Sequence, residues 1–207
     1  MIDVYTANTP NGVKITIALE EMGVPYDLHM IDLGANEQKS PGFLEINPNG
    51  RIPAIIDRDG PGGAAVNVWE SGAVLLYLAE KYGKLLPEDP ALRIEAIAWT
   101  YFQTGGIGPI MGQAGWFKRN MPDTPAAFDR FLKESERLVS VMEEALQDSD
   151  YLVGDEVTIA DIMHIGWLRL APSYFGLDMS PFPKTTAWVE RMLAREGVQR
   201  GLSVLKK

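Results

Sequence analysis

The chain of 207 residues contains no cysteine. This absence excludes disulfide bonds, thiolate metal ligands and a cysteine nucleophile that belongs to the protein itself. Histidine is almost as scarce, because only His29 and His164 are present and they lie far apart in the sequence. A histidine-based metal centre is therefore not expected. Each histidine is better explained as a strand or helix residue with a local hydrogen bond.

Positive charge and long apolar runs are also in short supply. The net charge of -9 and the pI near 4.8 disfavour nucleic acid and anionic membranes as partners, so an anionic ligand needs a local basic site. No stretch approaches the roughly 20 apolar residues of a membrane-spanning helix. The N-terminus lacks the basic and apolar regions of a signal peptide, which leads us to expect a soluble protein in the cytoplasm.

The first 83 residues alternate between strand-like and helix-like patterns. Their spacing predicts strands at 1–5, 26–33, 54–56 and 66–68, and helices at 13–22, 41–46 and 71–82. The first two strands flank a helix and should be parallel, whereas the last two flank a Gly-rich turn and should form an antiparallel hairpin. This region is therefore predicted to be an α/β domain.

The remainder of the chain has helical periodicity only. A linker with two prolines at 85–90 separates it from the first region. Helices are predicted at 91–104, 110–117, 125–146, 159–171 and 183–195, with a break or bend at Gly105–Pro109 and a shorter helix at the end. Thr158 and Asp161 have the spacing of a capping box. The expected organisation is thus an α/β domain at 1–84 and an all-helical domain at 91–207.

The segment from Asn49 to Gly72 carries the strongest chemical signal. A helix that begins at Ser71 would present unpaired N–H groups to an anion, and Arg51 could add a positive charge. Pro53 opens a strand, where a cis bond fits, but only about 5–6% of X-Pro bonds are cis, so local sequence favours trans. A plain helix cap at Ser71 and a solvated Arg51 are the simpler explanations of the separate residues.

Three motifs together resemble the soluble glutathione transferase family along essentially the whole chain. They are Arg51–Ala54, Glu70–Gly72, and Val153–Asp155 with Thr158–Asp161. The resemblance implies a thioredoxin-like N-terminal domain, an all-helical C-terminal domain, a cis bond before Pro53, and a homodimer. Thr9-Pro10-Asn11-Gly12 looks like the bacterial Nu-type branch, whose members are glutathione-dependent disulfide-bond reductases.

The same resemblance assigns a role in glutathione binding to particular residues of this chain. Thr9 and Asn11 would hydrogen-bond the glutathione sulfur, and the backbone of Ile52 would pair with the cysteinyl unit. Glu70 and Ser71 would hold the γ-glutamyl end. Gln38 and Arg51 would also contact the tripeptide. Arg130 would reach the site of the neighbouring subunit.

These assignments agree with the chemistry of the ligand and lead to a functional hypothesis. Glutathione has two carboxylates and one ammonium, which match Ser71, Arg51 and Glu70. The thiolate of bound glutathione would attack a disulfide or a small electrophile, so the enzyme is expected to be a disulfide-bond reductase with transferase activity. The second hypothesis is an enzyme that mainly conjugates glutathione to aromatic electrophiles. The alternative outside the enzymes is a non-catalytic glutathione-binding or interaction module. Simpler roles stay open for four of these residues. Thr9 and Asn11 can be turn residues only, Gln38 can be an ordinary residue of a polar loop, and Arg130 can be a solvated charge on a helix.

Overall fold

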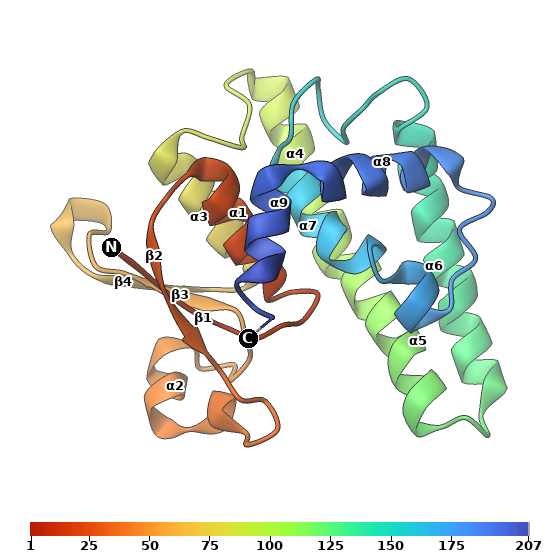
Figure 1. Cartoon of the computed structure of the whole chain (residues 1–207), viewed down its shortest axis with the longest axis horizontal. Coiled ribbons are helices and arrows are strands. Elements are labelled where there is room, and N and C mark those ends of the chain that lie inside the picture. Colours follow the sequence, from red (N-terminus) through yellow and green to blue (C-terminus); the bar gives the residue numbers. More distant parts are fainter. Residues whose placement is uncertain (207) are drawn as a thin grey trace. The chain divides into compact units, whose positions relative to one another are not determined.

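The computed structural model describes residues 1–206, which form two compact units (Figure 1). The sheet unit comprises Met1–Leu86 together with the segment from Ala194 onward. The helical unit comprises Pro87–Leu193. None of the helices in residues 1–206 combines the length and the apolar character needed to cross a membrane.

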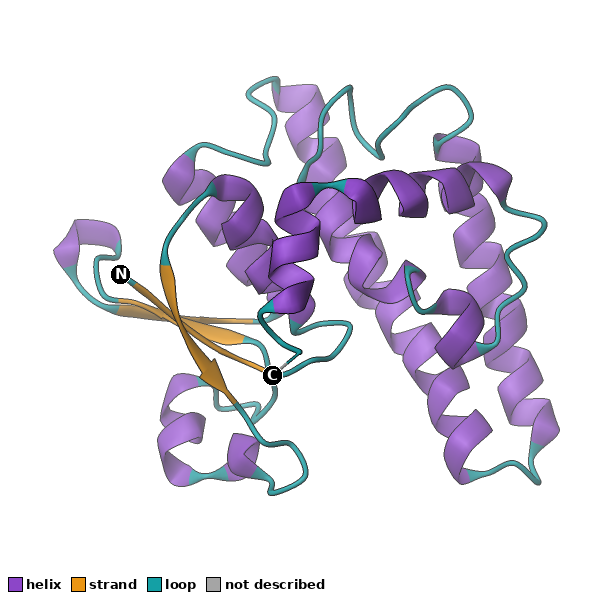
Figure 2. Ribbon diagram, viewed as in Figure 1, coloured by secondary structure: helices purple, strands orange, loops and turns teal. Residues whose placement is uncertain are grey.

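The sheet unit contains four strands in the order β2-β1-β3-β4 (Figure 2). Strands β1 and β2 are parallel and β3 and β4 are antiparallel, as the sequence predicts. The antiparallel pairing of β1 with β3, which the sequence did not predict, joins the two pairs into one sheet. The elements are β1 (Ile2–Thr6), α1 (Val13–Met22), β2 (Tyr26–Met30), α2 (Pro41–Ile46), β3 (Ala54–Asp57), β4 (Val66–Trp69) and α3 (Ser71–Tyr82).

The strand register brings three connections to one edge of the sheet. Tyr5 near the end of β1 pairs with Ala54 at the start of β3, and Ala54 pairs with Trp69 at the end of β4. Adjacent strands lie about 4.8 Å apart, so these three positions form a short row. The loop after β1, the segment before β3 and the turn after β4 therefore leave the sheet side by side.

The two faces of the sheet have different coverings. Ile2 and Val4 point to one face, are fully buried, and belong to the core that α1 and α3 complete. Tyr5 points to the other face, where its ring meets Phe43 of α2 edge-on and stacks on His29 at 4.5 Å between centroids. The core therefore fixes α1 and α3 on the same face, with both helices starting at the edge described above.

Helix α9 (Glu196–Ser203) packs on α1, as Figure 1 also shows. A Cβ atom added to Gly201 would lie 2.5 Å from the Cα of Ile17, so only glycine permits this approach. Thr16 donates a hydrogen bond to the Gly201 carbonyl at 2.7 Å. The segment from Ala194 onward thus packs with the sheet unit, although it follows the helical unit in the chain. The predicted domains at 1–84 and 91–207 stay a prediction.

The helical unit follows the predicted order of helices with one change. Its elements are α4 (Pro90–Phe102), a π-helical turn (Gln103–Ile107), α5 (Gly108–Asn120), α6 (Pro125–Ala145), α7 (Ile159–Leu168), a second π-helical turn (Ala171–Phe175) and α8 (Pro183–Ala194). The predicted break at Gly105–Pro109 is a π-helical turn that joins α4 to α5. A π turn is wider than an α turn, which gives room to Pro109, whose ring would otherwise meet the carbonyl one turn earlier.

Asp161 holds the start of α7 in place, and the predicted capping box is confirmed. Its Oδ2 accepts a hydrogen bond from the Thr158 N–H at 3.0 Å. Its Oδ1 accepts bonds from the Leu152 N–H at 3.1 Å and the Trp188 Nε1–H at 2.9 Å. Burial raises the pKa of Asp161 above its ordinary value in spite of these donors. One buried carboxylate thus ties together α7, the loop before it and α8.

Candidate functional site

The loop between β1 and α1 presents a hydroxyl donor at a helix start. The Thr9 Oγ1 accepts a hydrogen bond from the Gly12 N–H at 3.0 Å. Because a hydroxyl has one proton and two lone pairs, the Thr9 proton stays available for donation. A Cβ on Gly12 would lie 2.0 Å from the Ala7 carbonyl oxygen, so the tight loop requires glycine. Thr9 and Asn11 are both half-buried beside the N-terminus of α1, where a negative charge is favoured.

The turn between β4 and α3 combines a carboxylate with a second helix start. Glu70 has φ 68° and ψ 118°, a conformation that residues other than glycine rarely adopt. Such strain is concentrated at binding and catalytic sites. Helix α3 begins at Ser71, so the first backbone N–H groups have no partner within the helix. The turn can therefore receive an ammonium at Glu70 and a carboxylate at Ser71.

Lys14 on α1 also belongs to this region, and our sequence analysis missed it. The residue is fully buried, and its Nζ donates a hydrogen bond to the Ser71 Oγ at 3.2 Å. Burial holds the pKa of Lys14 well below its ordinary value, and the Glu70 carboxylate acts in the opposite direction. The available signal was a lysine between Val13 and Ile15 in the apolar run that starts the helix.

Asparagine side chains shape the segment that leads into β3. The buried Asn47 donates through Nδ2 to the Arg51 carbonyl at 2.6 Å and accepts from the Asn49 N–H at 2.9 Å. Asn49 in turn donates through Nδ2 to the Glu70 Oε1 at 3.4 Å. The Ile52–Pro53 bond is cis, so the implication of the family resemblance is confirmed and the local preference for trans is wrong here. Arg51 itself is exposed.

Gln38 and Lys39 approach this segment from the turn before α2. Gly50 has φ +60°, and a Cβ at this position would lie 2.9 Å from the Gln38 carbonyl oxygen and 2.7 Å from the Lys39 Nζ. Lys39 donates through Nζ to the Asn49 carbonyl at 3.2 Å. The Gln38 Oε1 is buried and has no hydrogen-bond partner within residues 1–206. A buried acceptor without a partner is unfavourable, which suits an N–H group supplied by a ligand.

The predicted site residues of the sheet unit therefore lie on connected segments. Thr9 and Asn11 lie in the loop after β1, Ile52 lies just before β3, and Ser71 starts α3 after β4, all at the edge fixed by the register. Hydrogen bonds join α1 to α3 and the 47–51 segment to Glu70. The resulting surface offers two helix starts, one carboxylate and one arginine, which is a suitable set for a zwitterionic ligand with more than one carboxylate.

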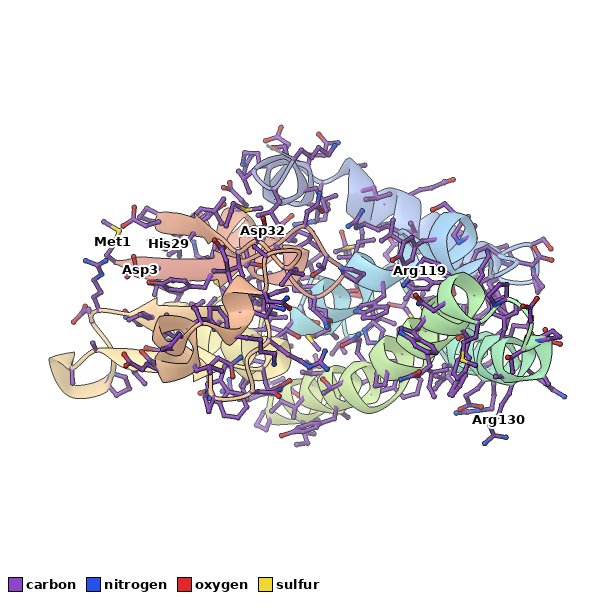
Figure 3. All side chains as sticks on the ribbon, turned by 90° about the horizontal axis from the view of Figure 1, so that it is seen from below. Met1, Asp3, His29, Asp32, Arg119 and Arg130 are labelled. Atoms are coloured by element: carbon purple, nitrogen blue, oxygen red, sulfur yellow. The ribbon has the colours of Figure 1, made fainter. Side chains whose placement is uncertain are left out.

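Arg130 belongs to the helical unit. It lies on the exposed side of α6 (Figure 3) and lines a cavity of about 760 Å³ together with Phe131, Arg137 and Phe182. Its predicted contact with the site of a neighbouring subunit stays a prediction.

A second polar cluster lies on β1 and its neighbours and has a structural character. The Asp3 side chain is buried and accepts two hydrogen bonds from Arg58, at 2.7 and 3.0 Å. The His29 Nε2 lies 3.1 Å from the Asp3 Oδ1, and Figure 3 labels both of these residues. The bonds from Arg58 lower the pKa of Asp3, against the effect of burial.

The other histidine, His164, forms a hydrogen bond with the Ala160 carbonyl on its own helix. Residues 1–206 contain no group of three or more potential ligands that could hold a metal ion.

Comparison with family models assigns both units. The model described as "Glutathione S-transferase, N-terminal domain" matches residues 9–81, and the model described as "Glutathione S-transferase, C-terminal domain" matches residues 108–196. The disulfide-bond oxidoreductase YfcG of Escherichia coli is 41% identical over 204 residues, which cover 98% of this chain and 94% of that protein. The disulfide-bond oxidoreductase YghU of the same organism is 37% identical over 213 residues, covering 97% of this chain and 73% of that protein.

Solved structures agree with these matches and confirm the thioredoxin-like and all-helical fold class. A glutathione transferase family member from Pseudomonas fluorescens, with two glutathione bound, has a TM-score of 0.93 and 39% identity, covering 97% of this chain and 92% of that chain. A glutathione transferase from Pseudomonas putida, with one glutathione disulfide bound per subunit, has a TM-score of 0.92 and 38% identity, covering 98% and 91%. The chain belongs to the glutathione S-transferase family.

Proposed function

We propose that this protein is a glutathione-dependent disulfide-bond reductase that also has glutathione transferase activity. The observation that carries the proposal is the strand register, which brings the Thr9 loop, the segment with Ile52 and the start of α3 to one edge of the sheet. Relatives named disulfide-bond oxidoreductases and neighbours crystallised with glutathione support the same activity.

The residues present fit the functional groups of glutathione. The start of α3 and the Ser71 hydroxyl suit the γ-glutamyl carboxylate, and Glu70 suits the adjacent ammonium. Arg51 suits the glycyl carboxylate, and the backbone of Ile52 is the proposed partner of the cysteinyl unit. The partnerless Oε1 of Gln38 can accept an N–H of the tripeptide.

Thr9 and Asn11 are the proposed catalytic residues. The Thr9 hydroxyl accepts from Gly12, so its own proton is available for donation to a sulfur anion at the start of α1. Donors of this kind favour the thiolate over the thiol and so increase the reactive fraction near neutral pH. When bound, glutathione supplies the sulfur that this cysteine-free chain lacks. Two glutathione thiols become one glutathione disulfide as the substrate disulfide becomes two thiols, so electrons and protons balance.

The experiment that tests the proposal compares Asn11→Ala with wild type in disulfide reduction and in conjugation of an aromatic electrophile. We expect kcat to fall by about 100-fold or more in the preferred reaction, as for the loss of one donor to a developing anion. Asn8→Ala, an exposed position in the same loop, is the control and should leave both rates unchanged. Unchanged rates in Asn11→Ala would refute the catalytic assignment. Binding of glutathione by calorimetry without turnover of any disulfide or electrophile would point to a binding module.

A homodimer is part of the proposal, and one face of α4 supports it. Ile94, Ala98 and Tyr101 follow helical spacing and are exposed, with 63% of Ile94 and 72% of Tyr101 accessible. Exposed apolar side chains along one helix face are typical of an interface. Sedimentation of Tyr101→Lys should show a shift toward monomer, and an unchanged sedimentation coefficient would argue against this interface. The contact of Arg130 with the partner's site and the cytoplasmic location stay predictions.

A further inference from the structure

Lys14 has an unusual position for a lysine. Within residues 1–206 it is the lysine whose whole side chain is buried, in a part of α1 where Val13, Ile15 and Ile17 are fully buried as well. Burial of a lysine is unfavourable, and an apolar side chain of similar length would fill the same space without that penalty. Packing alone therefore does not account for the amino group at this position.

The Lys14 amino group reaches the site through Ser71. Its Nζ lies 3.2 Å from the Ser71 Oγ, and this bond links α1 to the first residue of α3. When the Ser71 oxygen accepts from Lys14, its own proton is free to point elsewhere. Ser71 is 9% exposed and is the first residue of α3, so a ligand bound at this helix start can accept that proton. By donating to the Ser71 oxygen, the lysine leaves the Ser71 hydroxyl to act as a donor at a helix start, where an anion is favoured.

We propose that Lys14 is a positioning residue of the glutathione site: it orients the Ser71 hydroxyl so that the hydroxyl donates to the γ-glutamyl carboxylate. This inference rests on the proposed function and adds a residue to it. Glu70 brings a negative charge to the same turn, and the whole chain carries a net charge of -9. A basic group beneath Ser71 offsets this unfavourable field where a carboxylate has to bind.

The electrostatics of Lys14 support the same role. Its pKa is well below the ordinary value because the side chain is buried, and a nearby carboxylate acts to raise it. A ligand carboxylate at Ser71 would raise the pKa of Lys14, as the Glu70 carboxylate does, and would so favour the protonated amine. Binding of the anion and protonation of the lysine therefore reinforce each other.

The first test is Lys14→Met, measured by calorimetry and by steady-state kinetics. Met matches the length of the lysine stem without its amino group. We expect the affinity for glutathione to fall about 10-fold, with KM raised and kcat at saturating glutathione nearly unchanged. Lys84→Met is the matched control, since the Lys84 Nζ bonds the Met22 carbonyl at 2.6 Å near the other end of α1. The control should bind glutathione as wild type does.

The second test uses two analogues that separate the ends of the γ-glutamyl group. γ-Aminobutyryl-cysteinylglycine lacks its carboxylate, and glutaryl-cysteinylglycine lacks its ammonium. Lys14→Met should weaken binding of glutathione and of the glutaryl analogue by similar factors, but leave binding of the γ-aminobutyryl analogue almost unchanged. A merely structural lysine would weaken all three ligands alike.

The outcomes distinguish this inference from the proposed function. Equal losses for all three ligands, or no loss for glutathione, would overturn the role of Lys14 and leave the proposed function standing. Failure of the wild-type protein to bind glutathione would overturn both. Thermal melting shows whether Lys14→Met is folded; if it is not, Lys14→Gln is measured with the same analogues, and the same selective loss is required.

Discussion

Two buried ionisable side chains near the starts of helices, Lys14 on α1 and Asp161 on α7, differ in where their hydrogen bonds lead. The Asp161 carboxylate binds the Thr158 and Leu152 N–H groups and the Trp188 indole, all buried within the helical unit. The Lys14 amino group binds Ser71, which lies where the loops of the proposed site meet. We therefore use the partners of a buried charge, more than its burial, to separate the structural role of Asp161 from the role proposed for Lys14.

Asp161→Ala should produce the largest effect. The substitution leaves two backbone N–H groups and the Trp188 indole without their acceptor, and each such buried donor is unfavourable. We expect the free energy of unfolding of the helical unit to fall by about 3 kcal/mol or more. Urea unfolding followed by tryptophan fluorescence measures this loss. A loss below about 1 kcal/mol would mean that the carboxylate is not the structural centre described above.

Lys14→Met should have an effect on stability that is smaller and opposite in sign. The substitution removes the desolvation penalty of the buried amino group together with its bond to Ser71, so we expect the free energy of unfolding to be unchanged or to rise by about 1 kcal/mol. Urea unfolding of wild type and variant, without ligand, gives the value. A loss of stability like that of Asp161→Ala would abolish the contrast between the two residues.

Asp3 is a third buried ionisable residue, and its substitution should have the smallest effect, which depends on pH. Its pKa is lowered in the folded state by Arg58, so its carboxylate contributes stability above the unfolded pKa of about 4, and this contribution is lost as pH falls through the lower folded value. The stability difference between wild type and Asp3→Asn should therefore shrink between pH 6 and pH 3, as measured by urea unfolding. The raised pKa of Asp161 predicts the opposite slope. A constant difference for Asp3 would contradict the ion pair.

Much of the fold could be predicted because local signals agree with the tertiary structure. Gly23 and Gly83 adopt the left-handed conformation that ends α1 and α3, and Thr158 caps α7. The sequence did not reveal that the Gly105–Pro109 segment stays helical, since a π turn has no clear pattern. Nor did it place α9 on α1, because a contact that depends on Gly201 meeting the backbone at Ile17 is invisible to periodicity.

The candidate site divides in the same way. Motif residues such as Ser71 and Ile52 could be named from the sequence, because their chemistry is local to a helix start or a proline. Lys14, Asn47 and Asn49 could not, since each acts through a hydrogen bond to a distant or structurally defined partner. An apolar run that contains one lysine predicts burial but not the partner that the lysine meets.

The packing of α9 on α1 has a consequence for how the protein is made on the ribosome. Residues 87–193 lie between the two parts of the sheet unit along the chain, so this unit is interrupted by the helical one. During synthesis the helical unit emerges complete while one side of α1 is still uncovered. The ion pairs Arg195–Glu21 and Arg200–Glu20 form only after the last helix has left the exit tunnel. The sheet unit, whose strands are translated first, therefore gains its last contacts only after the whole helical unit has been synthesised.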